Sequence, residues 1–376
     1  MVRMRFPKIH TPVRIDRAFF FCLFCLLSGG GAVAQYVGLD DLQIWRLKQL
    51  TRSDAGVKRQ YDSLQQIADE ALQEEPNPID TIRTEGLLQG DPRKTATWAA
   101  FEDFRKMYAL ALAYRVTGRR AYLDKATVYL FDWASTNIPR GDPIDDTNLD
   151  PAIEAYDMIK DKLVYGENKR IRNWLRRTAQ AEIDAPYNQP GRASATNNWH
   201  SHRLKIVGEI AYAIGDEALE RYCVAGLKEQ IGRNLHADGS SDDFVARDAL
   251  HYHVYDLEPL LKLSIVLKGA TGVDYYAYEA PSGSSIKKSV DWLLPYLDGR
   301  KTHAEFVNST VEFDRKRAQN GEAAYKAGSF FDPRNGVATL LLAARFDDML
   351  MEPARKLLGS AEKYPAWQAV VNELPR

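Results

Sequence analysis

Cysteine is almost absent from this sequence, and its placement is informative. Of the three cysteines, Cys22 and Cys25 lie in the first 34 residues, so that Cys223 stands alone in the remainder. A single cysteine makes no internal disulfide, and a hydrophobic core must hold the fold together. The sequence also has no P-loop, no G-x-S-x-G nucleophile elbow and no dinucleotide-binding fingerprint. We therefore predict no cofactor.

The chain also lacks an excess of basic charge. It has 50 Lys and Arg against 51 Asp and Glu, and the first 34 residues hold five of the basic residues and one of the acidic ones. The remainder is therefore slightly acidic, which argues against nucleic acid as a partner. If the ligand is a polyanion, a local cluster of cations must attract it.

Residues 1–34 have the pattern of a secretory signal peptide. Basic residues precede the apolar run 18–27, and Ala32-Val33-Ala34 forms a cleavage signal before Gln35. We expect the mature chain, residues 35–376, to be exported to the periplasm or secreted, with no membrane association after cleavage. No apolar run of membrane-spanning length follows residue 35. No linker divides the mature chain, so we expect one domain; its oligomeric state is open.

Apolar side chains recur at helical spacing through most of the mature chain, and alternating strand patterns are scarce. Several predicted helices stop at a glycine and the next begins at once, as at Gly118, Gly215 and Gly272, where a left-handed residue is expected. Repeated helix hairpins predict an all-α fold, an incomplete α/α barrel (toroid) with an inner and an outer layer; a helical solenoid is the alternative. The predicted helices are 98–115, 121–135, 151–163, 169–183, 201–214, 217–235, 249–267, 286–297, 336–350 and 353–374. Irregular stretches at 72–93, 139–151 and 184–198 are expected to be binding loops or ordinary connectors.

Histidines are few and unevenly placed. Of the seven, His10 lies in the leader, and the other six fall between His200 and His303. Four of these six belong to two short segments, residues 195–204 and 247–260. Because histidine titrates near neutral pH and serves as acid, base or ligand, this concentration predicts a functional site.

The second segment is predicted to be a helix that extends back to Arg247. Arg247, His251 and Tyr255 then lie four residues apart and share one face, with Tyr252 beside them. A guanidinium next to a phenol favours the phenolate, so we expect Arg247 to lower the pKa of Tyr255 and make it a proton acceptor and donor. The alternative is that both tyrosines simply face the core.

The first segment begins with Asn197 and Asn198, which are good N-cap residues for the following helix. The N–H groups there also suit a bound carboxylate, and His200 is close enough to reach the same ligand. His202 should point elsewhere and is expected to be structural. Neither histidine pair has the i, i+4 spacing of a helical metal site, so we predict no metal; a zinc ion held by His200, His251 and a carboxylate is the alternative.

These two segments resemble the motifs of the α/α-toroid alginate lyases. The match comprises Asn197-Asn198-Trp199-His200 and the run from Arg247 through Ala249-Leu250-His251-Tyr252-His253-Val254-Tyr255-Asp256-Leu257-Glu258-Pro259-Leu260. Arg83-Thr84-Glu85-Gly86 is similar to the lid-loop segment of that family, and the resemblance covers roughly residues 75–270. Two departures, Trp199 before the histidine and the position of Arg247, are closer to a related branch that includes glucuronan lyases.

The resemblance implies a polysaccharide lyase that cleaves a β-1,4-linked uronate polymer, alginate with polymannuronate preferred, by β-elimination. It implies Tyr255 as base and acid, Asn198 as the neutraliser of the substrate carboxylate, His200 as the catalytic histidine and Arg247 as the site arginine. Asn, His, Arg and Tyr suit that reaction, because its intermediate is a dianion that donors and cations stabilise. The alternatives are a glucuronan lyase of the same mechanism, a periplasmic polyuronate-binding protein and an α/α-barrel glycoside hydrolase.

Further residues are expected to bind the partner, an anionic polysaccharide such as alginate or glucuronan. Basic side chains would hold its carboxylates, and aromatic ones would contact its sugar faces. The candidates are Arg83, Asn197, Trp199, His251, Tyr252, His303 and Arg315. For the segment around His303 and Arg315, an ordinary surface loop is the alternative.

Overall fold

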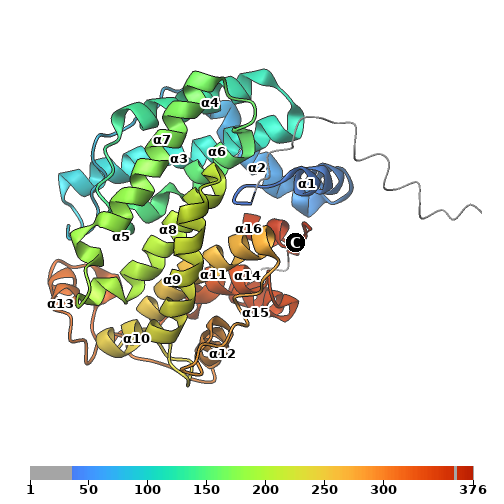
Figure 1. The fold of residues 1–376 in the computed structure, drawn as a ribbon. Helices are drawn as coiled ribbons and strands as arrows, with labels where there is room; N and C mark the ends of the chain where they lie inside the picture. Colours follow the sequence, from blue (N-terminus) through green and yellow to red (C-terminus); the bar gives the residue numbers. More distant parts are fainter. Residues whose placement is uncertain (1–35, 360–361, 376) are drawn as a thin grey trace, which may run out of the picture. The chain divides into compact units, whose positions relative to one another are not determined.

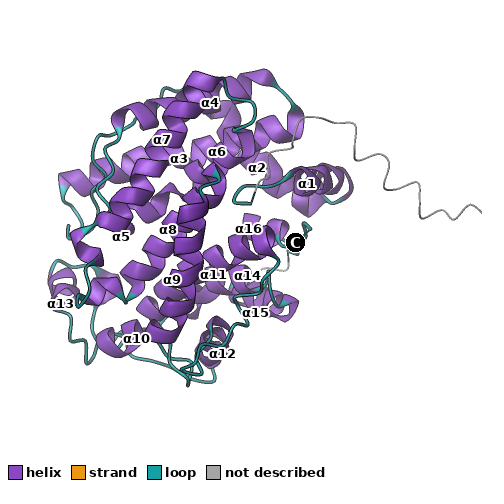
Figure 2. Cartoon of the chain, viewed as in Figure 1, coloured by secondary structure: helices purple, strands orange, loops and turns teal. Residues whose placement is uncertain are grey.

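Helices make up nearly all the regular structure in the computed structural model, which describes residues 36–359 and 362–375 (Figures 1 and 2). Within these residues, extended pairing is limited to two isolated bridges, Leu235 with Ser241 and Ala304 with Phe330. The predicted all-α class is confirmed. The predicted signal peptide, residues 1–34, lies outside the described residues. In the part of the chain that is described, no helix is long and apolar enough to cross a membrane.

The chain runs from helix to helix through short connections. The longer helices are α1 (Asp41–Ser53), α2 (Ala55–Ala71), α3 (Pro92–Thr117), α4 (Arg120–Thr136), α6 (Asp150–Ile159), α7 (Tyr165–Asp184), α8 (Asn198–Ile214), α9 (Glu217–Asn234), α11 (Leu250–Thr271) and α12 (Ile286–Leu297). The shorter ones are α5 (Pro143–Asp146), α10 (Asp242–Arg247), α13 (Glu312–Gln319), α14 (Val337–Ala343), α15 (Met351–Leu357) and α16 (Trp367–Val371). The 3₁₀ turns are η2 (Thr147–Leu149), η3 (Pro186–Asn188), η4 (Ala193–Ala195), η5 (Ala323–Tyr325), η6 (Pro333–Gly336) and η7 (Asp348–Leu350).

The helices form two layers. α6, α8 and α11 bury most of their side chains, whereas α4, α7 and α9 bury one face and expose the other. α8 lies at the centre and packs against α11, α9, α7 and α6 (Figure 1). A helix that is buried on all sides must be covered by apolar surfaces of its neighbours. The amphipathic outer helices provide these surfaces with their buried faces. These are the inner and outer layers that the repeated hairpins predict.

Glycine ends three of these helices as expected. Gly118, Gly215 and Gly272 take φ values of 75°, 61° and 73° at the ends of α3, α8 and α11. Only glycine adopts this left-handed conformation without a Cβ penalty, so each helix stops there and the chain turns into the next element.

The two predicted C-terminal helices, 336–350 and 353–374, are wrong in extent. The first breaks after α14, where Asp347 is extended and its carboxylate accepts the N–H of Met349 at 3.0 Å. The second breaks after α15, where Gly359 has a φ of 60° and Pro365 follows. A proline disfavours the helical conformation of the residue before it, so α16 begins only at Trp367.

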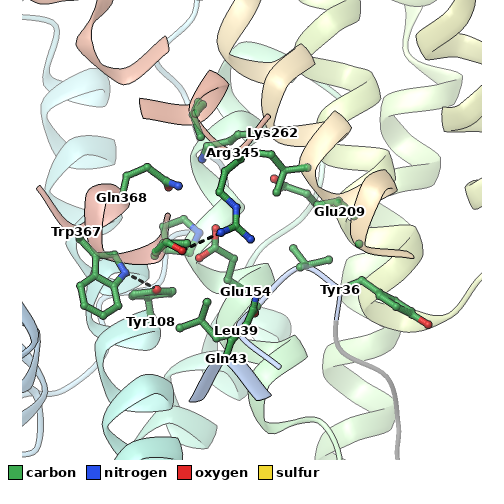
Figure 3. A pocket seen from close by; sticks show the side chains of 18 of the residues that line it. Tyr36, Leu39, Gln43, Tyr108, Glu154, Glu209, Lys262, Arg345, Trp367 and Gln368 are labelled. Carbon is green, nitrogen blue, oxygen red and sulfur yellow. Dashed lines mark hydrogen bonds between the residues drawn. The ribbon is translucent and has the colours of Figure 1, made fainter. Parts of the chain in front are cut away.

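The first two helices contact the C-terminal segment of the described chain. The Gln43 side chain donates to the Pro375 carbonyl and that of Gln60 to the Tyr364 carbonyl, both at 2.9 Å. A cavity of about 510 Å³ lies between these ends of the chain and the inner helices (Figure 3). Its lining includes Tyr36, Tyr108, Glu154, Glu209, Lys262 and Trp367. None of the site residues predicted from the sequence lines it.

Candidate active site

Tyr255 lies in the second turn of α11 at the centre of a group of aromatic side chains. Its ring packs against His202, with centroids 4.3 Å apart, and against Tyr252 at 6.3 Å. It also borders the apolar cluster that contains Phe306 and Tyr325. In the described part of the chain, no hydrogen bond occupies the Tyr255 hydroxyl. This hydroxyl is therefore available to a ligand.

The surroundings of Tyr255 act on its ionisation in opposite directions. Burial raises the pKa of Tyr255, and the nearby Tyr325 and Glu258 raise it further. Arg317 opposes them, because a positive charge favours the phenolate. Burial thus favours the neutral phenol of Tyr255, and Arg317 favours its phenolate.

Arg247 does not share a helix with Tyr255, so the predicted single helix is wrong. α10 ends at Arg247, Asp248 adopts a φ of 50°, and α11 begins only at Leu250. Glu305 holds this break, because its carboxylate accepts the first two N–H groups of α11 at 2.8 and 3.0 Å. These N–H groups have no acceptor within the helix, and a carboxylate from a distant loop satisfies them.

The Arg247 guanidinium lies over Tyr252 instead of Tyr255. It is 3.7 Å from the centroid of the Tyr252 ring, and its Nη1 pairs with Asp314 at 2.6 Å. Burial raises the pKa of Tyr252, and Arg247 offsets this only in part. The expectation that Arg247 lowers the pKa of Tyr255 is therefore wrong: that pKa is raised, and Arg247 is stacked on the neighbouring tyrosine.

Arg317 of α13 is the cation that the sequence analysis missed. Its Nη1 donates to the Tyr252 hydroxyl at 2.8 Å. The guanidinium lies 4.3 Å from the Phe313 ring centroid and 4.6 Å from that of Tyr325. The Phe313 and Tyr325 rings and the Tyr252 hydroxyl thus hold Arg317 in place. Its buried Nε–H has no acceptor among the described residues.

Arg315, the residue expected to bind substrate, lies on a different side of the same helix. It is exposed, and its guanidinium contacts the Ser309 carbonyl at 3.1 Å. The sequence does not separate Arg315 from Arg317, because the contact of Arg317 with Tyr252 and the burial of Asp314, at 1% exposure, appear only in the folded chain. The Asp314 carboxylate pairs with Arg247.

The start of α8 is organised by Asp243. Asn197 is the N-cap, as expected, and accepts the Trp199 N–H at 3.1 Å. Asn198 is buried, and both its backbone N–H, at 2.7 Å, and its side-chain amide donate to Asp243. Burial raises the pKa of Asp243, while Asn198 and Arg247 oppose the rise. The Asp243 carboxylate therefore links Asn198 to the Arg247 side of the site.

His200 and His202 face different sides of α8. His200 Nδ1 lies 3.4 Å from Arg203 Nη1, and no contact within the described residues joins His200 to Tyr255. Burial, together with Arg203 and Arg233, lowers the pKa of His200 to about 4. His202 is 4% exposed and packs against Tyr255. The expectation that His202 points away from the site is wrong, because it lies directly against the proposed base.

His251 belongs to the group around Tyr255. Its ring lies 5.1 Å from Tyr252 and 5.8 Å from Tyr325. Burial, with Arg317 and Arg247, lowers the pKa of His251 to about 4. At neutral pH it is therefore an uncharged imidazole in a site whose positive charge comes from arginine.

His303 and Trp199 make contacts outside this group. His303 Nε2 donates to the Asp248 carbonyl at 3.0 Å and so steadies the turn between α10 and α11. Trp199 packs edge to face against Tyr187, with ring centroids 5.2 Å apart, and Tyr187 is 40% exposed. Trp199 lies about one helical turn before His202 along α8.

The segment Arg83-Thr84-Glu85-Gly86 is held by Asp145. One oxygen of Asp145 accepts the Thr84 N–H and hydroxyl, both at 2.6 Å, and the Glu85 N–H at 2.9 Å. Burial raises the pKa of Glu85, whereas Arg317 and Arg247 lower it. The positive charges of both arginines therefore favour the ionised form of Glu85. Arg83 is exposed.

This segment also meets the chain that follows α13. The Gln89 N–H donates to Glu322 at 2.9 Å, and the Asn320 side chain donates to the Gln89 carbonyl at 3.1 Å. Residues far apart in the sequence thus join the loop before α3 to the chain that follows Arg317. Across the described residues, no group of three or more His, Cys, Asp or Glu side chains is arranged to hold a metal ion.

Solved structures with a similar fold are alginate lyases. An alginate lyase from Bacteroides ovatus matches with a TM-score of 0.68 and 15% identity, over 92% of this chain and 100% of that one. A His→Ala variant of alginate lyase A1-III complexed with a tetrasaccharide matches with a TM-score of 0.58 and 18% identity, over 85% and 91%. Alginate lyase A1-III from Sphingomonas species A1 matches at 0.54 and 18%, over 81% and 95%. These likenesses show the α/α-toroid fold. Among curated proteins, none matches the sequence significantly.

The sequence profile named Alginate lyase matches residues 48–303, more than half of the chain. Together with the toroid, this match defines the class: the protein is a polysaccharide lyase. The chain belongs to the alginate lyase family. The binding-protein and glycoside-hydrolase alternatives are thereby set aside.

Proposed function

We propose that this enzyme cleaves β-1,4-linked uronate polymers, with the polymannuronate of alginate preferred, by β-elimination in which Tyr255 is both base and acid. The observation that carries the proposal is the Tyr255 hydroxyl, which has no protein partner in the described residues and lies near Arg317. A relative of similar fold is complexed with a tetrasaccharide, which supports an anionic oligosaccharide as ligand.

The reaction needs a base, an acid and a neutraliser. Tyr255 as phenolate takes the proton from C5 of the uronate. The electron pair left behind forms the C4–C5 double bond, and the C4–O bond breaks. The departing oxygen takes the proton back from Tyr255, which restores the phenolate. One residue is suited to both transfers, because in mannuronate and glucuronate the proton and the leaving oxygen lie on the same side of the ring.

The carboxylate beside C5 must be neutralised before the proton becomes acidic, since the intermediate is a dianion. Arg317 has an unused Nε donor, and Asn198 is fixed by Asp243 with one amide hydrogen remaining. We assign neutralisation of the substrate carboxylate to these two residues. Arg247, which contacts Asp314 and Tyr252, adds a second positive charge to the site. The role of His200 as the catalytic histidine stays a prediction.

The test is the ultraviolet absorbance of the conjugated unsaturated uronate that elimination creates. Purified residues 35–376 would be incubated separately with polymannuronate, polyguluronate and glucuronan. A rise that is fastest on polymannuronate is expected. A rise on glucuronan alone would favour the glucuronan lyase alternative with the same mechanism, and no rise on any polymer would contradict elimination.

We also propose that residues 1–34 are a signal peptide and that the mature enzyme is one exported domain. The basic residues, apolar run and Ala-Val-Ala sequence before Gln35 support this. Amino-terminal sequencing of the protein recovered from the periplasm and the medium is the test. A protein that keeps residues 1–34, or that stays in the cytoplasm, would contradict the proposal.

A further inference from the structure

His202 is enclosed between three elements of the inner layer. It projects from α8 against Tyr255 of α11, with the two rings tilted by 42°. Its Nδ1 lies 2.7 Å from the Thr147 hydroxyl of η2. At 4% exposure the imidazole is buried, and its neighbours are Tyr255 and Thr147. Its influence on the reaction therefore passes through Tyr255.

The hydrogen-bond partners of Thr147 determine which way its own proton points. Lys205 Nζ donates to the Thr147 carbonyl at 2.9 Å, to the Thr147 hydroxyl oxygen at 2.7 Å and to Asp150. An ammonium group has donors only, so the Thr147 oxygen must accept from Lys205. The one hydroxyl proton is then free to donate to an unprotonated His202 Nδ1. An Nδ1–H that donated to the second lone pair of the oxygen would leave the Thr147 proton without an acceptor.

The tautomer of His202 follows from this chain of donors. Burial lowers the pKa of His202 to about 3, so the ring is neutral and carries one proton. With Nδ1 accepting, that proton is on Nε2. Among the described residues, Nε2 has no hydrogen bond of good geometry. The backbone carbonyl of Tyr255 favours the charged ring and so opposes the effect of burial on the pKa of His202.

The Tyr255 carbonyl is available for a reason that the sequence shows. In a regular helix it would accept the N–H of the residue four positions later, which here is Pro259. Proline has no N–H, so this carbonyl keeps a free lone pair inside α11. The contact between His202 and Tyr255 is the one between their rings.

We propose that Thr147 and Lys205 are positioning residues that hold His202 as its neutral Nε2–H tautomer, and that His202 in this form fixes the ring of Tyr255 for proton transfer. The proposal rests on the function proposed for Tyr255. The opposite tautomer would point Nδ1–H at a hydroxyl already bound to an ammonium group and leave the Thr147 proton without an acceptor.

Lys262 provides a matched control. It pairs with the other carboxylate oxygen of Asp150 and lines the cavity described above (Figure 3). It therefore shares the buried partner of Lys205 but has no contact with Thr147. An effect that came only from losing a charge beside Asp150 would appear equally in Lys205→Met and Lys262→Met.

The first measurement is the ¹⁵N spectrum of histidine-labelled enzyme, with the His202 signals identified by their loss in His202→Gln. We expect a neutral ring protonated at Nε2 throughout the pH range in which the protein is folded. Thr147→Val and Lys205→Met should change its tautomer, and Thr147→Ser and Lys262→Met should not. An Nδ1–H ring in the unmodified protein would overturn the proposal without any reference to turnover.

The second measurement is turnover of the same variants on the polymer that the enzyme cleaves. A small displacement of a catalytic group costs about a hundredfold in rate, so kcat of Thr147→Val and Lys205→Met should fall by about tenfold to a hundredfold with KM unchanged. Thr147→Ser should restore kcat and Lys262→Met should keep it. Equal kcat in Thr147→Val and Thr147→Ser would overturn the positioning role. An unreactive enzyme with the Nε2–H ring would contradict the function of Tyr255 and leave the tautomer assignment standing.

Discussion

Replacing Tyr255 by phenylalanine removes one hydroxyl and tests the proposed chemistry directly. That hydroxyl has no partner in the described part of the chain, so its loss leaves no buried donor or acceptor unpaired. The free energy of unfolding of Tyr255→Phe should therefore change by less than about 0.5 kcal/mol. The ring still packs against His202, which keeps the local structure in place.

The effect on turnover should be large. A positioned acid or base contributes about 10²–10⁴-fold to rate, and here one group serves as both. We expect kcat of Tyr255→Phe to fall by about 10³-fold or more, with KM close to that of the unmodified enzyme, because the hydroxyl acts on the reacting atoms. The assays are the absorbance of the unsaturated product and a urea titration of the same preparation.

Tyr252→Phe is the matched control, three residues earlier on the same helix. It loses the hydrogen bond from Arg317 at 2.8 Å and leaves a buried charged donor unpaired. Its stability should fall by about 1–3 kcal/mol while turnover remains measurable. If Tyr255→Phe kept kcat within about tenfold of the unmodified enzyme, a base and acid role for Tyr255 would be refuted.

Three further outcomes are expected. Arg317→Gln should move the pH profile of activity to higher pH, because Arg317 lowers the pKa of Tyr255 and its loss leaves less phenolate at any given pH. Measurement of kcat from neutral to alkaline pH checks this. A shift to lower pH would contradict it. Asp145→Ala should free Thr84 and Glu85, since three hydrogen bonds to one oxygen are lost; their amide exchange should accelerate while that of α11 does not, and unchanged exchange would show that other contacts hold the segment. Dialysis against EDTA should leave kcat unchanged, because guanidinium groups supply the positive charge; a loss that a divalent cation restores would point to a metal.

The layers of the fold could be predicted from the sequence because they depend on local signals. Helical apolar spacing locates the core face of each long helix, and the glycines at 118, 215 and 272 mark where helices stop. The C-terminal region could not be divided correctly in this way. The extended conformation of Asp347 depends on a side-chain contact that periodicity does not report.

The site was predicted in part, and the errors have one cause. Tyr255 and the residues on its own helix lie where spacing places them. Arg247 does not, because Glu305, far along the chain, takes the first N–H groups of α11 and permits the break at Asp248. Arg317 was missed for the same reason, since only the folded chain brings α13 against Tyr252. Contacts between distant segments decide which cation reaches the tyrosine.

The meeting of Gln89 with Asn320 and Glu322 has a consequence for the order of events during folding. These contacts join residues more than 230 positions apart. Closing so long a loop is entropically costly and comes late, after the local helix pairs have formed. A chain whose central helices have already assembled would still lack Arg317 beside Tyr255. Polymer-cleaving activity should therefore return as one of the last events of refolding, after the helical content has recovered.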